Sequence, residues 1–296
     1  MAGLKIRWID HRGKVWHLTE GTEGVILDLG QRGLDWSPIE HTFTGGGLVH
    51  AAATVSRPVH ALKVLVGWDL DGDAFYRLNS EWWEQANSPF YEGTLEVTRP
   101  DGVTRSRRLR LAGSPETNYT YDPGTRNEDR QPEVWELTGD GAWWYGVEQS
   151  VVFTNASVTG GGTTPFYGNS PNKWPLYISA PGVAADAWVS NTGQGDMWLK
   201  WTIVGPATSV LVGVTGTGVL AYSGSVAAGE IVEIDTDPAH RSVTEVVSGA
   251  NRYGFVSGKY APVPVGDRVP LTIRAEGITT ATSITVTGRA AYARAF

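Results

Sequence analysis

The stretch from Asn191 to Thr236 constrains the fold of this chain more than any other. It reads NTGQGDMWLKWTIVGPATSVLVGVTGTGVLAYSGSVAAGEIVEIDT. An alternating segment ends at Gly-Pro-Ala, a second apolar segment follows, and a Gly-Glu turn leads into a strand that ends in Ile-Asp-Thr. Alternation of apolar and polar residues is typical of strands that bury one face. Because no acid–base pair or metal-ligand set falls within it, we expect a β-sandwich whose surface, rather than a reaction centre, carries the function.

The rest of the second half repeats this pattern of short strands between turn residues. Gly, Pro, Asn and Asp separate the apolar runs at the short spacing of a sandwich or jelly roll. Within the run 198–204, alternation places Trp198 and Lys200 on one face and Leu199 and Trp201 on the other. We expect strands at 176–179, 187–189, 198–204, 209–214, 219–222, 230–235, 243–247, 271–275 and 283–290.

The first half also reads as strands, with one short helix. A turn at Arg-Gly joins the runs 4–9 and 14–18 into a hairpin. The segment Asn79–Asn87, NSEWWEQAN, is the best helix candidate, because Asn79 or Ser80 can cap it and Asn-Ser-Pro ends it. Trp82 and Trp83 are adjacent and cannot share a helix face, so one is expected on a sheet and the other against a loop or a neighbouring subunit. Further strands are expected at 24–29, 48–56, 59–68 and 133–137.

The clearest local signal is a hairpin around Arg99-Pro100-Asp101-Gly102. The runs 93–98 and 103–111 flank this turn sequence. The return strand carries four arginines, which we expect mostly on a solvated or intersubunit face: Arg105, Arg107, Arg108 and Arg110. The alternative, a basic stripe for nucleic acid, is opposed by the nearby acidic residues Glu92, Glu96, Asp101 and Glu116.

Charge divides the chain into two parts. Up to residue 150 there are 15 Lys and Arg against 22 Asp and Glu, and beyond it 9 against 9, so the net charge of −7 belongs to the first half. The Gly- and Thr-rich run 155–164 reads as a connection or long loop. We therefore predict domains at 1–155 and 156–296. An acidic half does not suit binding to a phosphate backbone.

A search for chemistry finds no assembled site. The chain has no cysteine, its six histidines have no metal-binding spacing, and no nucleophile elbow, P-loop or dinucleotide fingerprint occurs. The alternate aspartates from Asp69 to Asp73 lack the Gly and Glu positions of a calcium loop, so a solvated turn is favoured. The pair Asp235 and Asp237 reads as turn capping, although a carboxylate pair for glycoside hydrolysis remains open. We expect no catalytic residue, cofactor or metal.

The abundance of tryptophan raises a second alternative. The chain has 13 tryptophans. Core packing is the common role of such side chains. Exposed tryptophans can instead stack on sugar rings, and the candidates in the second half for glycan or partner contact are Trp188, Trp198 and Trp201. The charged N-terminus has no apolar export segment, so no Sec-type signal is expected, and no apolar run is long enough to span a bilayer.

Several of these segments together resemble one family. SEWWEQANSPFYEGTLEVTRPDGVTRSRRLRL in the first half, and NKWPLYISAPG, WTIVGPATSVLVGV and AAGEIVEIDT in the second, are similar to the distal tail proteins of siphovirus phages, of the actinobacterial-phage type and often called minor tail proteins. The late turn reads Val265-Gly266-Asp267 where the family commonly has Pro-Gly-Asn or Pro-Gly-Asp. The resemblance covers most of the chain and rests on fold-bearing patterns, not on a catalytic signature.

The resemblance implies a fold and a role. It implies a mainly β protein with an N-terminal split-barrel-like ring domain, one short helix and a C-terminal galectin-like β-sandwich. It implies a hexameric ring at the virion tail tip, made in the host cytoplasm, that joins the tail tube protein and the tape measure protein to the baseplate hub. Outward sandwiches would carry receptor-binding proteins or contact host cell-wall glycan. Trp82, Trp83, Arg105 and Arg107 are the intersubunit candidates. An adhesion module that binds cell-wall glycan is the alternative function.

Overall fold

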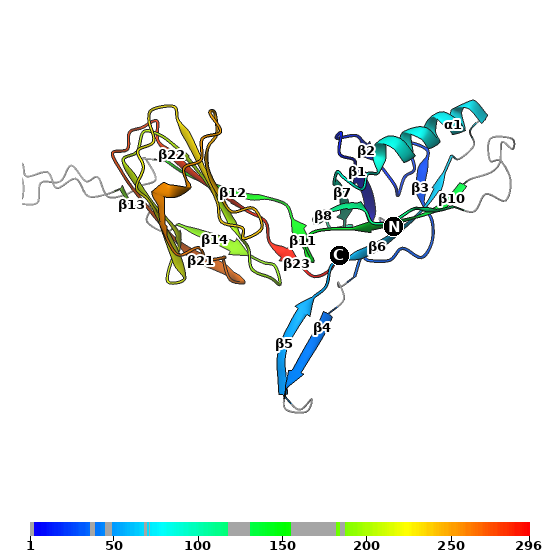
Figure 1. The fold of residues 1–296 in the computed structure, drawn as a ribbon, viewed down its shortest axis with the longest axis horizontal. Coiled ribbons are helices and arrows are strands. Elements are labelled where there is room, and N and C mark those ends of the chain that lie inside the picture. Colours follow the sequence, from blue (N-terminus) through cyan, green and yellow to red (C-terminus); the bar gives the residue numbers. More distant parts are fainter. Residues whose placement is uncertain are drawn as a thin grey trace, which may run out of the picture. The chain divides into compact units, whose positions relative to one another are not determined.

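The structure is a computed structural model and is mainly β (Figure 1). It describes residues 3–35, 39–44, 49–67, 70, 72–117, 131–154, 182–183 and 187–296. Several features expected from the sequence lie wholly or partly outside these residues: the alternate aspartates at 69–73, the triple glycine at 45–47, the loop 119–130, the connection 155–164 and the strand at 176–179.

The chain divides into two units that differ from the predicted division. Unit 1 comprises residues 1–147 together with 291–296, and unit 2 comprises residues 148–290. The C-terminal segment returns to unit 1 because its strand pairs there, Trp144 with Tyr292, and because Ala295 is fully buried in that unit's core. A single boundary drawn from composition cannot show that the last residues of the chain belong to the first unit.

Unit 1 is built on a ten-stranded sheet. Its main path runs β2-β1-β7-β8-β10-β6-β3, with β9, β11 and β23 attached beside it, and every pairing is antiparallel. The strands are β1 (Lys5–Ile9), β2 (Val15–Trp16), β3 (Val25–Leu27), β6 (Val59–Val66), β7 (Gly93–Thr98), β8 (Thr104–Leu111), β9 (Glu116–Thr117), β10 (Gln131–Thr138), β11 (Trp144–Gly146) and β23 (Ala291–Tyr292).

The predicted Pro-Asp-Gly hairpin is confirmed, and the structure supplies its register. Strands β7 and β8 pair from Gly93 opposite Leu109 to Thr98 opposite Thr104. Gly102 closes the turn with a φ of 84°, in the left-handed region that favours glycine, and donates to the carbonyl of Arg99 at 2.9 Å. The predicted hairpin between β1 and β2 is confirmed as well, with Trp8 opposite Trp16.

The helix begins earlier than the sequence analysis predicted. Helix α1 spans Gly72–Glu81, and a π-helical turn η1, Trp82–Ala86, continues it. Asn79 and Ser80 therefore lie within α1 and do not cap its start, whereas the predicted end is correct because Asn87 is extended. The prediction failed because the N-terminal half of the helix follows an Asp-rich turn sequence and buries only Phe75.

Tryptophans dominate the core of unit 1. Trp8, Trp16, Trp82, Trp135 and Trp144 are all at most 1% exposed. Close packing explains Gly93, since a Cβ there would lie 2.2 Å from the ring of Trp8. Aromatic edge-to-face contacts link the cluster, with Trp82 centred 5.1 Å from Trp16 and 5.8 Å from Trp135.

A separate hairpin in unit 1 was not predicted as such. Strand β4 (Ile39–Thr44) pairs with β5 (Val49–Val55) as a two-stranded sheet, and neither pairs with another described strand. We call it the arm, and it projects away from the sheet in Figure 1. Only the β5 run was expected; β4 was missed because its polar composition, IEHTFT, gives no core-facing pattern.

Unit 2 is a sandwich of two antiparallel sheets. One has the order β12-β22-β15-β18-β19, and the other runs β13-β21-β16-β17-β20 with β14 also on β21. The elements are β12 (Gln149–Thr154), β13 (Gly182–Val183), β14 (Trp188–Asn191), β15 (Leu199–Val204), β16 (Ser209–Val214), β17 (Gly218–Tyr222), β18 (Ile231–Asp235), β19 (Ser242–Glu245), the 3₁₀ turn η3 (Tyr253–Phe255), β20 (Val256–Gly258), β21 (Gly266–Glu276) and β22 (Ser283–Gly288).

The core of unit 2 lies between its two sheets. Residues of β15 alternate strictly, with Leu199, Trp201 and Ile203 buried against Val210 and Val212 of the facing sheet. The predicted division of faces on β15 is thus confirmed. Strand β12 was not predicted; it puts Phe153 in the core, and the partly buried Val151 packs against the same core. Across the described parts of both units, no helix has the length and apolar character needed to cross a membrane.

Candidate functional site

Strand β4 of the arm is exposed along its whole length. Every side chain of β4 is exposed, including Phe43 at 53%. The Nδ1 of His41 and the Nε2 of His50 lie 3.1 Å apart, and the His50 ring is centred 5.6 Å from that of Phe43. A two-stranded hairpin is at best marginally stable alone in water. Its free strand edges and exposed apolar side chains suit pairing with another chain.

Arg107, expected on a solvated or intersubunit face, is buried. It is 2% exposed on β8, on the same side of the sheet as Leu109. Its Nε donates to the carbonyl oxygen of Trp143 at 3.1 Å, its Nη1 lies 3.0 Å from Nε2 of His60, and its guanidinium carbon lies 4.8 Å from the ring of Trp144. The expectation of an intersubunit contact for Arg107 is therefore corrected: it is a core residue.

Burial perturbs the acid–base properties of this Arg–His pair. Desolvation lowers the pKa of His60 to about 3, and the positive charge of Arg107 acts in the same direction. Desolvation also lowers the pKa of Arg107 to about 10. At neutral pH His60 is thus a neutral acceptor and Arg107 a charged donor. The pair fixes β8 to β6 and gives no sign of a reaction centre, since its contacts are with the backbone carbonyl of Trp143 and the ring of Trp144.

The other arginines of β8 are also engaged within the unit. Arg105 stacks over Tyr292 at 3.9 Å and donates to the carbonyl oxygen of Arg294 at 2.9 Å, so it contacts the returning C-terminal segment. Arg108 and Arg110 both pair with Glu92, at 3.2 and 2.9 Å, and Arg110 also pairs with Asp140. These acidic partners neutralise the stripe that the nucleic-acid alternative required.

Trp82 and Trp83 point to different surroundings, as their adjacency requires. Trp82 is fully buried on the sheet, so it cannot contact a neighbouring subunit and that expectation is corrected. Trp83 is half-buried, with its ring centred 4.8 Å from that of Trp135. Its indole Nε1 donates to Oε1 of Glu133 at 2.9 Å.

Glu133 is a buried carboxylate that the sequence analysis did not single out. It is 2% exposed and accepts from the Nε1 of Trp135 at 2.7 Å as well as from Trp83. Desolvation raises the pKa of Glu133, although the indole hydrogen bonds act in the opposite direction. Glu133 lies two residues before Trp135 and four before Leu137, so alternation along the strand places all three side chains on the same buried face. This spacing could have identified Glu133 as a buried residue from the sequence. Glu133 holds helix, π-turn and sheet together.

The three tryptophans proposed for glycan contact have different environments. Trp201 is 1% exposed in the sandwich core, so the expected surface contact is corrected for that residue. Trp198 is partly buried on the opposite face of the same strand region. Trp188 is 42% exposed, and the guanidinium carbon of Arg268 lies 4.9 Å from its ring. Of these three, Trp188 offers the most accessible aromatic face.

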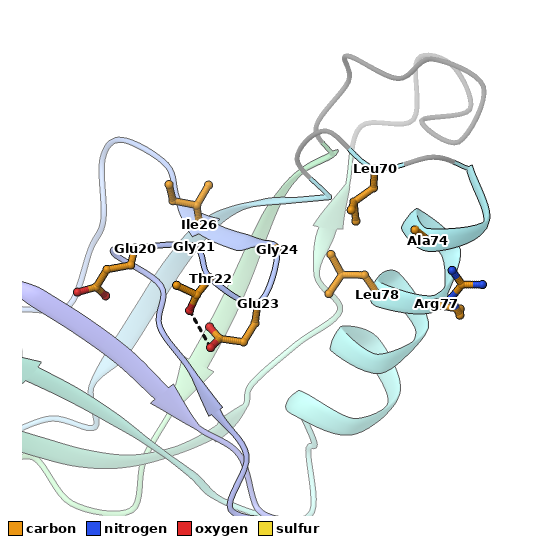
Figure 2. Close-up of a pocket in the computed structure, with 10 residues that line it drawn as sticks. All are labelled: Glu20, Gly21, Thr22, Glu23, Gly24, Ile26, Leu70, Ala74, Arg77 and Leu78. Carbon is orange, nitrogen blue, oxygen red and sulfur yellow. Dashed lines mark hydrogen bonds between the residues drawn. The ribbon is translucent and has the colours of Figure 1, made fainter.

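A pocket of about 540 Å³ lies between the loop 20–26 and α1 of unit 1 (Figure 2). Leu70, Ala74 and Leu78 form its apolar wall, with Arg77 beside them on the helix. The lining residues are Glu20, Gly21, Thr22, Glu23, Gly24, Ile26, Leu70, Ala74, Arg77 and Leu78.

The carboxylates of this pocket are engaged in local contacts. Glu20 pairs with Lys5 at 3.3 Å. Glu23 accepts from the hydroxyl of Thr22 at 2.8 Å, and its Oε1 lies 2.8 Å from Nδ1 of His17. Burial opposes but does not cancel these hydrogen bonds, which lower the pKa of Glu23. A lowered pKa does not suit a general acid.

The remaining sequence candidates are structural. Asp235 accepts from the amide of Asp237 at 3.0 Å, and Asp237 accepts from the amide of Ala239 at 2.9 Å, so the pair caps a turn. Among the described residues no group of three or more His, Asp or Glu side chains could hold a metal ion.

Comparison with known proteins identifies the fold. The crystal structure of Dit (gp 19.1) from phage SPP1 matches with a TM-score of 0.59 over 97% of this chain and 98% of that one, at 12% sequence identity. That protein is described as a paradigm of the hub adsorption apparatus in phages that infect Gram-positive bacteria. A structure of infectious bursal disease virus matches with a TM-score of 0.16, which is too low to carry an argument. No family model and no curated protein match. The chain shares the Dit fold.

Proposed function

We propose that this chain is a structural component of a phage tail tip, of the distal tail protein type. The observation that carries the proposal is the fold match with SPP1 Dit, which extends over nearly the whole of both chains. A match of that extent includes both units of this chain and their order along the sequence. The 12% identity supports the fold alone, so the role needs a direct test.

The proposed assembly is a closed ring, a hexamer, made by unit 1 between the tail tube and the baseplate hub. The arm supports a contact between copies, because its two strands pair with no other described strand and Phe43 is 53% exposed. No side chain of β4 is buried, so this strand of the arm does not help to fill the core of unit 1. With Trp82 and Arg107 buried, the arm replaces them as the intersubunit candidate.

Charge is compatible with this role. Residues 1–150, nearly all of them in unit 1, carry the excess of acidic residues, which would repel DNA passing through a ring without holding it. The galectin-like sandwich, unit 2, would face outward and hold adhesion devices. Contacts with the tail tube, tape measure, hub and receptor-binding proteins belong to the same proposal.

A second candidate function, cell-wall glycan binding, is favoured by Trp188. Its half-exposed ring and the stacked Arg268 present an aromatic face with hydrogen-bond donors beside it. Trp188→Ala should then weaken binding of the protein to host cell walls without lowering its melting temperature. Unchanged wall binding would remove this candidate.

Native mass spectrometry of the full chain tests the ring. One chain has a mass of 31.9 kDa, so a hexamer has a mass of about 191 kDa, six times that value. A variant with residues 39–55 replaced by a Gly-Ser linker should keep its fold and lose the oligomer.

Point variants separate an arm contact from a general loss of solubility. Phe43→Ser on the arm should shift the oligomer toward monomer, whereas Val152→Ser, an equally exposed apolar residue of unit 2, should not. An oligomer that forms equally well without the arm would contradict the proposed contact. A chain that stays monomeric with purified tube and hub proteins present would contradict the ring itself.

A further inference from the structure

One lateral edge of the sandwich in unit 2 carries a surface that the proposed ring does not use. Strands β19 and β20 are edge strands of the two sheets. The segment between them, with η3, crosses this edge and is fixed to β19, since the amide of Arg252 donates to the carbonyl oxygen of Val243 at 2.8 Å. We call Arg241, Tyr253, Phe255, Lys259 and Tyr260, which lie on or next to β19, η3 and β20, the edge patch.

Aromatic rings are exposed on the edge patch. Tyr253 is 44% exposed and Phe255 is 43% exposed, although large aromatic side chains are normally well buried. Tyr260 is half-buried beside Tyr253, with the two rings within 10° of parallel and their centroids 6.4 Å apart. The hydroxyl oxygen of Tyr260 is itself buried, so Tyr260 supports the ring of Tyr253, and Tyr253 and Phe255 supply the exposed aromatic surface.

The cations of the edge patch lack acidic partners. The guanidinium carbon of Arg241 lies 4.2 Å from the ring of Tyr260, and neither Arg241 nor Lys259 forms an ion pair with any carboxylate in the described part of the chain. By contrast, the nearby Arg252 pairs with Glu230 at 2.7 Å. Stacking occupies the face of a guanidinium and leaves its in-plane N–H donors for a carboxylate or phosphate.

Two carboxylates on either side of β19 already have local partners. Asp237 caps its turn and lies 3.8 Å from the imidazole of His240, and Glu245 accepts from the amides of Val247 and Ser248. The edge patch is therefore locally basic in a chain whose net charge is −7. A ligand matched to it combines apolar ring faces with acidic groups.

We propose that the edge patch binds an acidic saccharide, a glycan whose sugars carry carboxylate or phosphate groups. The C–H faces of the sugar rings would pack on Tyr253 and Phe255, and the acidic groups would bind Arg241 and Lys259. This site lies apart from Trp188 in the sequence, and its proposal does not depend on the ring.

Binding of the full chain to matched polysaccharides tests this assignment. Phosphomannan and neutral mannan differ in phosphate, while oligogalacturonate supplies carboxylates. Calorimetry should detect binding of one or both acidic saccharides and none of mannan, with affinity falling as salt rises. Arg241→Ala and Tyr253→Ala should each weaken binding about tenfold, a loss of about 1.4 kcal/mol.

Two controls keep the outcome decisive. Arg274→Ala removes an exposed cation from β21 of the same unit and should leave binding unchanged. Equal weakening in that variant, or binding of poly-L-glutamate as tight as that of the saccharides, would overturn the assignment and favour general charge attraction or an acidic protein partner. Absence of binding to both acidic saccharides below about 1 mM would overturn it as well. Melting temperatures within a degree or so of the parent exclude unfolding as the cause.

Discussion

Replacing Glu133 by glutamine should destabilise unit 1, even though it removes a buried charge. The two carboxylate oxygens each accept from a different indole, Oε1 from Trp83 at 2.9 Å and Oε2 from Trp135 at 2.7 Å. A glutamine has one oxygen and one NH₂ group, so one of the two indole N–H donors must lose its acceptor. An unsatisfied buried donor costs about 1–3 kcal/mol. The relief of burying a charge works against this cost, and we expect the loss to prevail because both hydrogen bonds are to a charged acceptor.

Thermal and denaturant unfolding of the full chain measure the effect. For a domain of this size each kcal/mol lowers the melting temperature by roughly 2–4 °C. The near-ultraviolet signal of the coupled Trp83 and Trp135 rings reports on unit 1. The matched control is Glu136→Gln, an exposed glutamate on the same strand, for which we expect a change within about 0.5 kcal/mol.

The pH dependence gives an independent check. Since the folded-state pKa of Glu133 is raised above its ordinary value of 4.5, the folded state binds more protons than the unfolded state in that range. The contribution of Glu133 to stability should thus fall as pH rises from about 4.5 through the folded-state pKa, and Glu133→Gln should lack this component. A glutamine variant as stable as the parent at pH 7 would refute the two-acceptor account.

The remaining predictions concern other buried side chains and can be measured by the same unfolding experiments. Arg107→Ala should cost about 2–4 kcal/mol, because it leaves carbonyl oxygens without donors and a cavity beside Trp144, whereas the exposed Arg108→Ala should stay within about 0.5 kcal/mol; similar losses in both would contradict the burial of Arg107. Since the folded-state pKa of His60 is lowered to about 3 from 6.5, its contribution to stability is present above pH 6.5 and is lost at about 1.4 kcal/mol per pH unit as pH falls toward 3, and His60→Asn should flatten this slope. Trp201→Ala should cost about 3–5 kcal/mol and Trp188→Ala less than about 1 kcal/mol; the reverse order would exchange their assigned environments.

Local patterns predicted much of the fold. The β7–β8 hairpin follows from one turn sequence, and its register follows from the turn. The faces of β15 follow from strict alternation, because Leu199, Trp201 and Ile203 must share one side of a strand. Such features depend on residues close in sequence, where backbone geometry and turn chemistry act directly.

Features that depend on distant partners were missed or misassigned. Arg107 stands among other polar residues in the sequence, so no local pattern indicates that it is buried. Its burial is possible because a backbone carbonyl and His60, both distant in sequence, satisfy its N–H donors. Strand β4 of the arm has no core-facing pattern, since all its side chains are exposed and the arm pairs with no other described strand. The start of helix α1 was missed because the residues around Gly72 and Asp73 are typical of a turn. Trp201 and Trp188 differ in role although their residue type is the same, because one lies on the inner face of the sandwich and the other near its edge.

Electron microscopy of virions tests the central proposal most directly. If the proposal holds, phage particles that contain this chain, labelled with gold through an antibody to unit 2, should carry the label at the distal end of the tail, where the tube meets the baseplate. Label along the tube, on the capsid, or absent from intact particles that contain the tail would contradict a tail-tip role.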